Sequence, residues 1–274
     1  MKKAIFVIFV FGFLWFSLES IAQFKPEEVA QNAKWEDFLK IAKIVDQRQM
    51  RISENSTQPW VLTLEKDSVT QTAVWKGLSG MYHVFKESWK AEIAAYRLSN
   101  YLGLNMVPPA VEREWEGKKG ACQLWEKGWE NFWEKASEKF KAKEFQSTDF
   151  VRKRCLQRAF DNLINNIDRH RGNVVILEDW RMILINHSRS FGTGKRSLKL
   201  IYDENNRESK NYIMDELPRA FFEKLKSLDA ATIKSAVGEY LTDEEINAIL
   251  KRRDLIVAWI DNHIKEKGEE HVLY

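Results

Sequence analysis

Residues 165–173 of the 274-residue chain read NNIDRHRGN, and this stretch decides the fold that the sequence predicts. It follows a helix that we expect to begin at the N-terminal cap Ser147 and to end near Asn166. Within the stretch, Asp168 lies five residues before Asn173. An Asp at this spacing can orient or deprotonate a hydroxyl group, while the side-chain oxygen of the Asn can hold a metal ion on a phosphate. The spacing therefore indicates a site for phosphate chemistry.

The residues that follow add geometry to this pattern. Two short apolar runs, residues 174–177 and 182–185, flank the turn sequence EDW and predict a β-hairpin. A hairpin of this length brings the chain back at Asn186, beside Asn173. A second ligand for the metal ion would belong at that position. The alternative for the whole stretch is a capped helix end followed by an ordinary hairpin.

A cation for the phosphates is expected at Lys76, the last residue of a strand predicted over residues 69–76. Its expected partner is Glu92, which falls within the apolar face of a helix predicted over residues 86–102. A carboxylate in such a place requires a cation, because the burial of an unpaired charge is costly. We therefore predict an ion pair between Lys76 and Glu92. The alternative is that both side chains are solvated at the surface, as most Lys and Glu side chains are.

Hydrophobic periodicity predicts the remaining elements. Further helices are expected over residues 26–49, 128–143, 218–228, 230–240 and 243–266. Hairpins are expected from the paired runs 60–64 with 69–75 and 107–115 with 121–125. Residues 192–212 are polar and aperiodic, and they predict a long loop. Because strands dominate the first half and helices the second, the predicted fold class is α+β with two lobes.

The composition excludes several classes of protein. The chain is 44% hydrophobic and 30% charged, a balance that builds a core and argues against disorder. A net charge of +3 creates little field for a polyanion, so we expect no nucleic-acid partner. Two cysteines cannot form a disulfide framework, although Cys122 and Cys155 could pair if they lie close together. No Cys or His spacing in the sequence indicates a zinc site.

Several of the eleven Trp residues crowd into one stretch, namely Trp115, Trp125, Trp129 and Trp133. Such a group can pack an interface between lobes, or it can stack on a sugar or a base. The second use would favour a carbohydrate-binding protein over a protein with phosphate chemistry.

The first 22 residues have the form of a secretory signal peptide. Lys2 and Lys3 precede fifteen uncharged, mostly apolar residues, and the small residues Ser20 and Ala22 mark a cleavage site. An uncleaved membrane anchor is the alternative, but fifteen residues are fewer than the roughly 20 that span a bilayer. We expect a secreted or periplasmic protein with no stable membrane insertion after cleavage.

Residues 58–192 resemble the atypical kinases, a group that spans the phosphatidylinositol 3- and 4-kinases, the HipA-like kinases and the secreted Golgi casein kinases. The resemblance rests on the strand that ends at Lys76 and on the sequences AEIAAY (91–96), LGL (102–104), VP (107–108) and DRHRGN (168–173). It implies a protein-kinase-like fold with ATP, together with Mg or Mn, between a small strand-rich N-lobe and a helical C-lobe. With the signal peptide at residues 1–22, the expected organisation is an N-terminal helical extension (23–57), an N-lobe (58–126) and a C-lobe (127–274). The C-lobe contains a catalytic-loop-like segment at residues 165–191.

The resemblance also implies roles for individual residues. Lys76 would clamp the phosphates and Glu92 would hold Lys76, while Asp168 would act on a hydroxyl acceptor. Asn173 and Asn186 would hold the metal ion. The hinge that meets the adenine would contain Gln123, Leu124 and Trp125. The acceptor could be a protein, a lipid or a small molecule.

Two features depart from the pattern of the atypical kinases. The group has an Asp before its His-Ser-Arg-x-Phe sequence, where this chain has Asn186 followed by HSRSF. An Asn offers Mg²⁺ a carbonyl oxygen but no charge, and Mg²⁺ prefers carboxylates. In addition, the turn expected to cover the phosphates, EKDS at residues 65–68, has no glycine and carries acidic residues. The first departure favours the alternative of a pseudokinase, a nucleotide-binding or scaffold module without turnover.

We predict that the exported protein begins at Gln23, because signal peptidase cleaves after small residues such as those at positions 20 and 22. The mass of the intact protein purified from its native host should equal that of residues 23–274. A protein that retains Met1, or that stays in the cytoplasm, would contradict the prediction.

Overall fold

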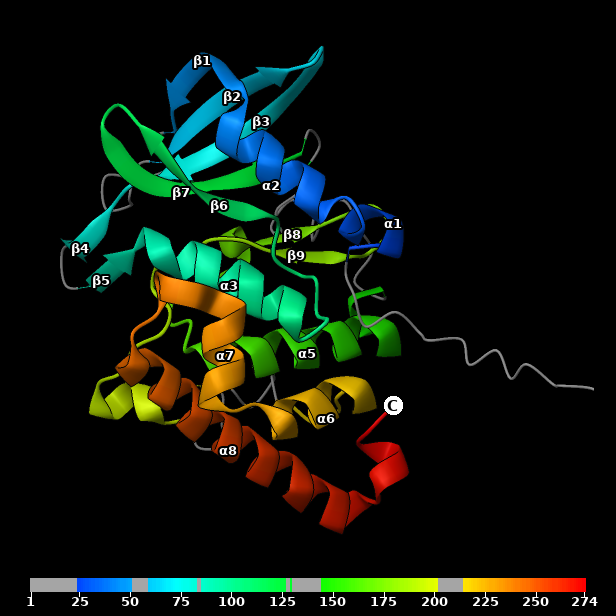
Figure 1. The fold of residues 1–274 in the computed structure, drawn as a ribbon. Helices are drawn as coiled ribbons and strands as arrows, with labels where there is room; N and C mark the ends of the chain where they lie inside the picture. Colours follow the sequence, from blue (N-terminus) through cyan, green and yellow to red (C-terminus); the bar gives the residue numbers. More distant parts are fainter. Residues whose placement is uncertain (1–23, 51–58, 83–84, 127–128, 130–143, 202–213) are drawn as a thin grey trace, which may run out of the picture.

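The computed structural model of the chain describes residues 24–50, 59–82, 85–126, 129, 144–201 and 214–274. The predicted signal peptide, Trp133 and all but one residue of the helix predicted over residues 128–143 lie outside this part of the chain. The described residues form an N-terminal sheet followed by a group of helices, which are the two lobes of Figure 1. The predicted α+β fold class is confirmed.

The N-lobe is built on a five-stranded antiparallel sheet with the strand order β1-β2-β3-β7-β6. Its strands are β1 (Lys43–Gln49), β2 (Trp60–Lys66), β3 (Val69–Lys76), β6 (Ala110–Trp115) and β7 (Lys118–Trp125). Both hairpins predicted here are confirmed. Alternating apolar side chains, among them Leu62, Leu64 and Ala73, turn one face of the sheet toward helix α2 (Asn32–Ile41) and are fully buried there.

The helix predicted over residues 26–49 is wrong beyond residue 41. The structure has a short helix, α1 (Pro26–Val29), then α2, and then strand β1 in place of the last helical turns. Ile44 and Val45 fit the period of a helix, but they are β-branched, and β1 pairs with β2 along the edge of the sheet. The pairing with a strand further along the chain decides the conformation, and local periodicity carries no information about that partner.

The C-lobe helices match their predictions. They are α5 (Thr148–Ile164), α6 (Arg219–Ser227), α7 (Ala230–Val237) and α8 (Asp243–Lys267). Ser147 caps α5, since its hydroxyl oxygen accepts a hydrogen bond of 3.2 Å from the amide of Phe150. Thr242 and Glu245 form a capping box at the start of α8. Polar caps at fixed spacings are local signals, and for this reason these boundaries could be predicted.

Helix α3 (Trp89–Tyr101) lies between the sheet and the C-lobe helices (Figure 1). The small hairpin of β4 (Ser79–Tyr82) and β5 (Phe85–Ser88) precedes it. Below the N-lobe sheet, β8 (Val174–Ile176) and β9 (Met182–Leu184) form the hairpin predicted after residue 173. The helix and the β8–β9 hairpin bring the predicted site residues to the junction of the two lobes.

The cysteines and one of the crowded Trp residues have structural roles. Cys122 and Cys155 are both buried and are not joined by a disulfide, so the pairing left open by the sequence is not formed. Trp115 packs edge-on against Trp60 and Trp75 in the N-lobe core, with ring centroids 4.9 and 5.0 Å away. Trp115 is therefore a packing residue, but it packs within the N-lobe core and not at the interface between the lobes that the sequence predicted.

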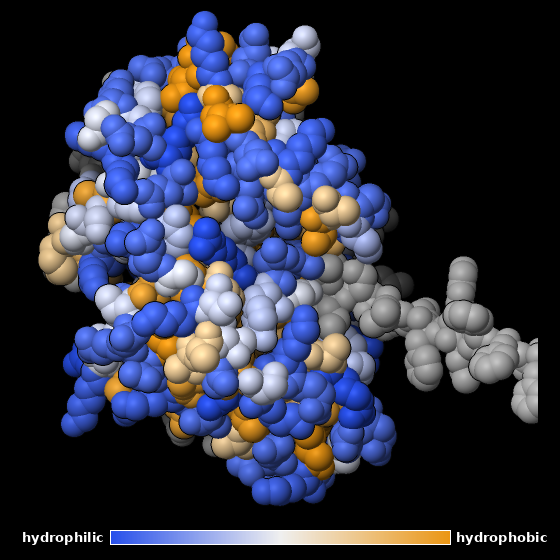
Figure 2. Space-filling view, in the orientation of Figure 1, coloured by the Kyte–Doolittle hydropathy of each residue, from blue (hydrophilic) through white to orange (hydrophobic). Residues whose placement is uncertain are grey.

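The molecular surface on the face shown in Figure 2 is mostly hydrophilic, and apolar residues occur on it in small groups. No helix in the described ranges has the length and apolar character needed to cross a membrane.

A buried arginine holds the C-lobe together. Arg252 of α8 is 0% exposed, and its guanidinium donates hydrogen bonds to the carbonyl oxygens of Leu163, Gly192 and Ser197 at 2.8, 2.9 and 3.0 Å. It thereby joins α8 to the end of α5 and to the segment after β9. Burial lowers the pKa of Arg252 to about 10, so the side chain stays charged at neutral pH.

We predict that Arg252→Leu lowers the free energy of unfolding by about 3 kcal/mol, because three buried carbonyl groups lose their donors. The neighbouring Lys251 is exposed, and Lys251→Leu should change stability by no more than about 0.5 kcal/mol. Urea unfolding of both variants measures the difference. Equal stability of the two variants would contradict the role given to Arg252.

Candidate active site

The predicted ion pair between strand β3 and helix α3 is present. Lys76 Nζ lies 2.6 Å from Glu92 Oε1, and Glu92 is 1% exposed. Its other oxygen, Oε2, accepts a hydrogen bond of 2.9 Å from the backbone amide of His187. Burial alone would raise the pKa of Glu92, but Lys76 and His187 outweigh it and hold this pKa well below its usual range. Glu92 is therefore ionised at any physiological pH.

His187 is a site residue that the sequence did not single out. It is fully buried, and Arg169 Nη2 lies 2.9 Å from its Nε2 atom. A guanidinium can only donate, so Nε2 accepts and the proton of the neutral ring sits on Nδ1. That atom faces Glu92 Oε2 at 3.4 Å. Burial lowers the pKa of His187, which keeps the ring neutral.

A second buried ion pair holds the loop that carries Asp168. Arg169 Nε lies 3.0 Å from Oδ2 of Asp161, a residue of α5. The side chains of Arg169 and Asp161 are 3% and 0% exposed. Arg169 Nη1 also donates to the carbonyl oxygens of Asn173 and Ile185, both at 2.6 Å. One guanidinium thus ties the loop to α5 and to both ends of the β8–β9 hairpin. The sequence analysis missed this pair, and its only signal was an Asp within the helix expected to end near Asn166.

The β8–β9 hairpin returns the chain as predicted, and a chain of side-chain contacts crosses the junction of the lobes. Lys76 Nζ donates to Asn186 Oδ1 at 2.9 Å. Asn186 Nδ2 donates to Asn173 Oδ1 at 3.2 Å, and Asn173 Nδ2 donates to the carbonyl oxygen of Asp168 at 2.8 Å. Five of the residues predicted from sequence, including Glu92, are therefore in one connected group.

Asp168 has a partner that the sequence analysis missed. Arg189 Nη1 lies 3.2 Å from Asp168 Oδ1, and Arg189 Nε lies 2.5 Å from Glu87 Oε1. The guanidinium also stacks on the ring of Phe85, 4.4 Å from its centroid. Glu87 is 2% exposed and belongs to β5. Arg189 thus joins the carboxylate of Asp168 to the β4–β5 hairpin of the other lobe.

The residues expected to hold a metal ion do not fit one. The side-chain oxygens of Asn173 and Asn186 already accept hydrogen bonds from within the chain. Among the described residues, no group of three or more His, Cys, Asp or Glu side chains could hold a metal ion. Mg²⁺ and Mn²⁺ prefer carboxylate oxygens, and this pair of amides supplies none.

The three residues expected at the hinge belong to strand β7. All three pair with β3, and Gln123 also pairs with Ala110 of β6. The backbone amide of Leu124 donates to Pro109, and the carbonyl oxygen of Trp125 accepts from the side chain of Gln71. Contact of residues 123–125 with an adenine stays a prediction.

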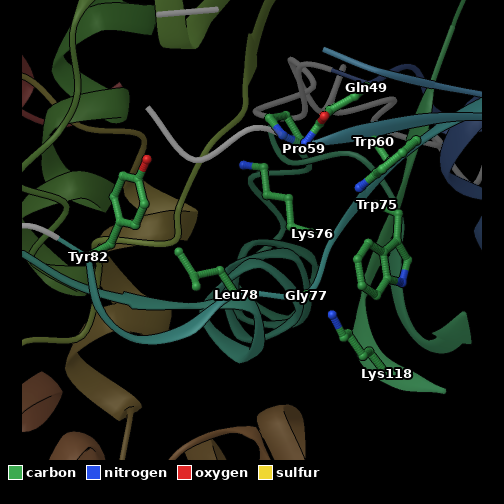
Figure 3. Close-up of a pocket in the computed structure, with 9 residues that line it drawn as sticks. All are labelled: Gln49, Pro59, Trp60, Trp75, Lys76, Gly77, Leu78, Tyr82 and Lys118. Carbon is green, nitrogen blue, oxygen red and sulfur yellow. The ribbon is translucent and has the colours of Figure 1, made fainter. Parts of the chain in front are cut away.

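A cavity of ≈ 410 Å³ lies at the Lys76 end of β3 (Figure 3). Gln49 and Pro59, on either side of the β1–β2 connection, line it together with Lys76. The turn at residues 65–68 lies at the opposite end of β3, about 23 Å away along the strand. The expectation that this acidic turn covers the phosphates is therefore wrong, because the antiparallel pairing places the end of β1 and the start of β2 beside Lys76 instead.

A second cavity, of ≈ 280 Å³, lies beside Arg189. Its wall includes Ile167 of the Asp168 loop, Ser190 and the segment 192–194. Through Ile167 and Arg189 the cavity adjoins the loop that carries Asp168.

Comparison with known proteins gives a match of fold but not of sequence. No protein-family model matches the chain, and neither does any curated protein. The structure of hydra Fam20 with sugar has a TM-score of 0.61 at 17% identity, over 91% of this chain and 93% of that one. The structure of the Golgi casein kinase has a TM-score of 0.61 at 16% sequence identity, and its structure with Mn/ADP bound has a TM-score of 0.62 at 15% identity. Each match covers 93% of this chain and 80% of the other.

The chain therefore has the atypical kinase fold of the Fam20 and Golgi casein kinase structures. The resemblance inferred from its sequence is confirmed for the Golgi casein kinases at the level of the fold.

We predict strong coupling between the two members of the central ion pair. Lys76→Met and Glu92→Gln should each lower the free energy of unfolding by about 3 kcal/mol, since each leaves a buried group without its partner. The double variant should lose much less than the sum of the two. Lys226→Met, in an exposed pair with Glu223, serves as the control and should change stability by less than about 1 kcal/mol.

The same pair predicts a dependence on pH. Because folding lowers the pKa of Glu92, its stabilisation is complete above the pKa of an unfolded Glu, about 4.3, and is lost progressively as the pH falls further. The wild-type protein should lose stability below this pH more steeply than the double variant. The pair is not coupled if the losses of unfolding free energy in the two single variants add up in the double variant. The same conclusion holds if wild type and double variant lose stability equally as the pH falls.

Proposed function

We propose that the chain is an exported kinase-like protein that binds ATP or a related nucleotide between its lobes and transfers the γ-phosphoryl group to a hydroxyl acceptor. One observation carries the proposal: the cation suited to phosphates, Lys76, is connected through Asn186 and Asn173 to Asp168. The fold supports it, since a kinase of the same fold has Mn/ADP bound. Export rests on the form of residues 1–22.

The side chains of the site have separate parts in this proposal. Lys76, held in place by Glu92, would attract the phosphates and position them. Asp168 would orient the acceptor hydroxyl or take its proton, and Arg189 would hold one of its carboxylate oxygens. The cavity beside Arg189 would receive the acceptor, which could be a protein, a lipid or a small molecule.

The second candidate is a pseudokinase that binds a nucleotide without turnover. Asn186 favours it, because a neutral amide stands where the atypical kinases have an Asp. The contact between Arg189 and Asp168 also favours it, since the guanidinium occupies a carboxylate oxygen that would otherwise be open to an acceptor hydroxyl. ATP is scarce outside most cells, and this also favours a pseudokinase if the protein is exported.

Binding is tested by the shift of the melting temperature in a panel of nucleotides. We predict that at least one nucleotide stabilises the wild-type protein and that Lys76→Met removes this effect, because the phosphates lose their cation. Lys66→Met, at the far end of β2, should keep it. If no nucleotide stabilises the wild-type protein, the proposed function is wrong.

Transfer is tested with the same proteins and labelled ATP. Asp168→Asn should bind nucleotide like the wild type but lose at least about 100-fold in transfer rate, because an amide cannot take the proton. Binding by the wild type without transfer to any protein, lipid or small-molecule acceptor would favour the pseudokinase.

A further inference from the structure

We propose that the side-chain amide of Asn186 replaces a bound divalent cation, so that the site binds nucleotide phosphates equally well with and without Mg²⁺. The inference rests on the proposed nucleotide binding and adds to it the chemical form of the ligand, a nucleotide that needs no metal ion. It follows from the direction of the hydrogen bonds between Lys76 and Asp168.

That direction is fixed at both ends. The ammonium of Lys76 can only donate, so the group 2.9 Å away on Asn186 is the amide oxygen. The Asn186 nitrogen then faces Asn173, where it requires an oxygen as its acceptor at 3.2 Å. The Asn173 nitrogen is left to donate to the carbonyl oxygen of Asp168, which can only accept. Only one arrangement of the two amides satisfies all three contacts.

In this arrangement an N–H group lies between the two oxygens that a cation would bridge. The oxygen of Asn173 receives the proton of Asn186, and the oxygen of Asn186 receives those of Lys76 and of Ser188, the latter at 3.3 Å. Mg²⁺ binds oxygen at about 2.1 Å, and beside the Asn186 oxygen it would meet the ammonium charge. The link between the lobes is therefore complete without an ion.

The charges around Lys76 also favour the binding of phosphates without a metal ion. The described contacts give its ammonium one carboxylate, that of Glu92, and one neutral amide, that of Asn186. With a single carboxylate beside it, the ammonium keeps part of its attraction for phosphate. A second carboxylate at position 186 would surround Lys76 with two negative charges, and a phosphate would then be repelled unless a cation were present.

A single exchange of atoms therefore tests the proposal. Asn186→Asp replaces the NH₂ group by an oxygen of nearly equal size. The backbone at Asn186 has φ 60°, a left-handed conformation that Asn and Asp both tolerate better than other residues with a Cβ. The variant keeps an oxygen for Lys76 but turns two oxygens toward each other at the contact with Asn173, where only a cation or a proton can join them.

The experiment is calorimetric titration of wild-type protein and Asn186→Asp with ATP, once with Mg²⁺ and once with EDTA. We expect the wild-type Kd to differ by less than about twofold between the two conditions. For the variant we expect binding roughly tenfold to a hundredfold tighter with Mg²⁺ than with EDTA, and in EDTA no tighter than that of the wild type. Asn105→Asp is the control. Asn105 also has a left-handed backbone, with φ 45°, but it belongs to the connection between α3 and β6. This variant should bind ATP like the wild type in both conditions.

Failure of this inference is distinct from failure of the proposed function. If the wild-type protein binds ATP only with Mg²⁺, or if Asn186→Asp gains no dependence on Mg²⁺, the inference is wrong and nucleotide binding stands. If no nucleotide binds in either condition, the proposed function is wrong and the inference is overturned with it. Should the variant not fold, which its thermal unfolding reveals, the comparison of Mg²⁺ with EDTA on the wild type still decides.

Discussion

The ion pair of Lys76 and Glu92 joins three parts of the chain that are far apart in sequence. It docks helix α3 onto the end of strand β3, and through the second oxygen of Glu92 it also holds the backbone of His187 after the β8–β9 hairpin. A buried carboxylate is tolerated only where donors surround it, so each of these three elements has to be in place for the others to be stable. The position of the lobes relative to each other depends on this carboxylate.

Two guanidinium groups extend this network into the C-lobe. Arg169 holds the loop of Asp168 between α5 and the β8–β9 hairpin, while Arg189 bridges Asp168 and Glu87 across the lobes. Arginine suits both places, because its planar donors can satisfy several acceptors at once. The carboxylate proposed to act on a hydroxyl is thus held by its backbone and by its side chain, and reorientation of Asp168 would require Arg189 to move.

Neutral side chains complete the site at positions 186 and 187. His187 is uncharged, and Asn186 connects Lys76 to Asn173 through an amide. The four residues that connect Lys76 to Asp168, and Glu92 as the partner of Lys76, could be predicted from sequence. A lone carboxylate on an apolar helix face needs a cation, and a hairpin of known length returns at a known residue. The partners of His187 and Arg189 could not be predicted. Both residues belong to the HSRSF sequence, but an Arg or a His in a polar run carries no local sign of the acceptor it will meet.

The sequence by itself determined the fold class, the boundaries of the capped helices, the β8–β9 hairpin and the group of side chains at its base. These follow from periodicity, capping and strand length, which act over a few neighbouring residues. Only the tertiary structure decided that residues 43–49 are a strand, that Gln49 and Pro59 and not the turn at 65–68 lie near Lys76, and which way the amide of Asn186 faces. Each of these depends on a hydrogen-bond partner far away in the chain, and such a partner exists only after the chain has folded.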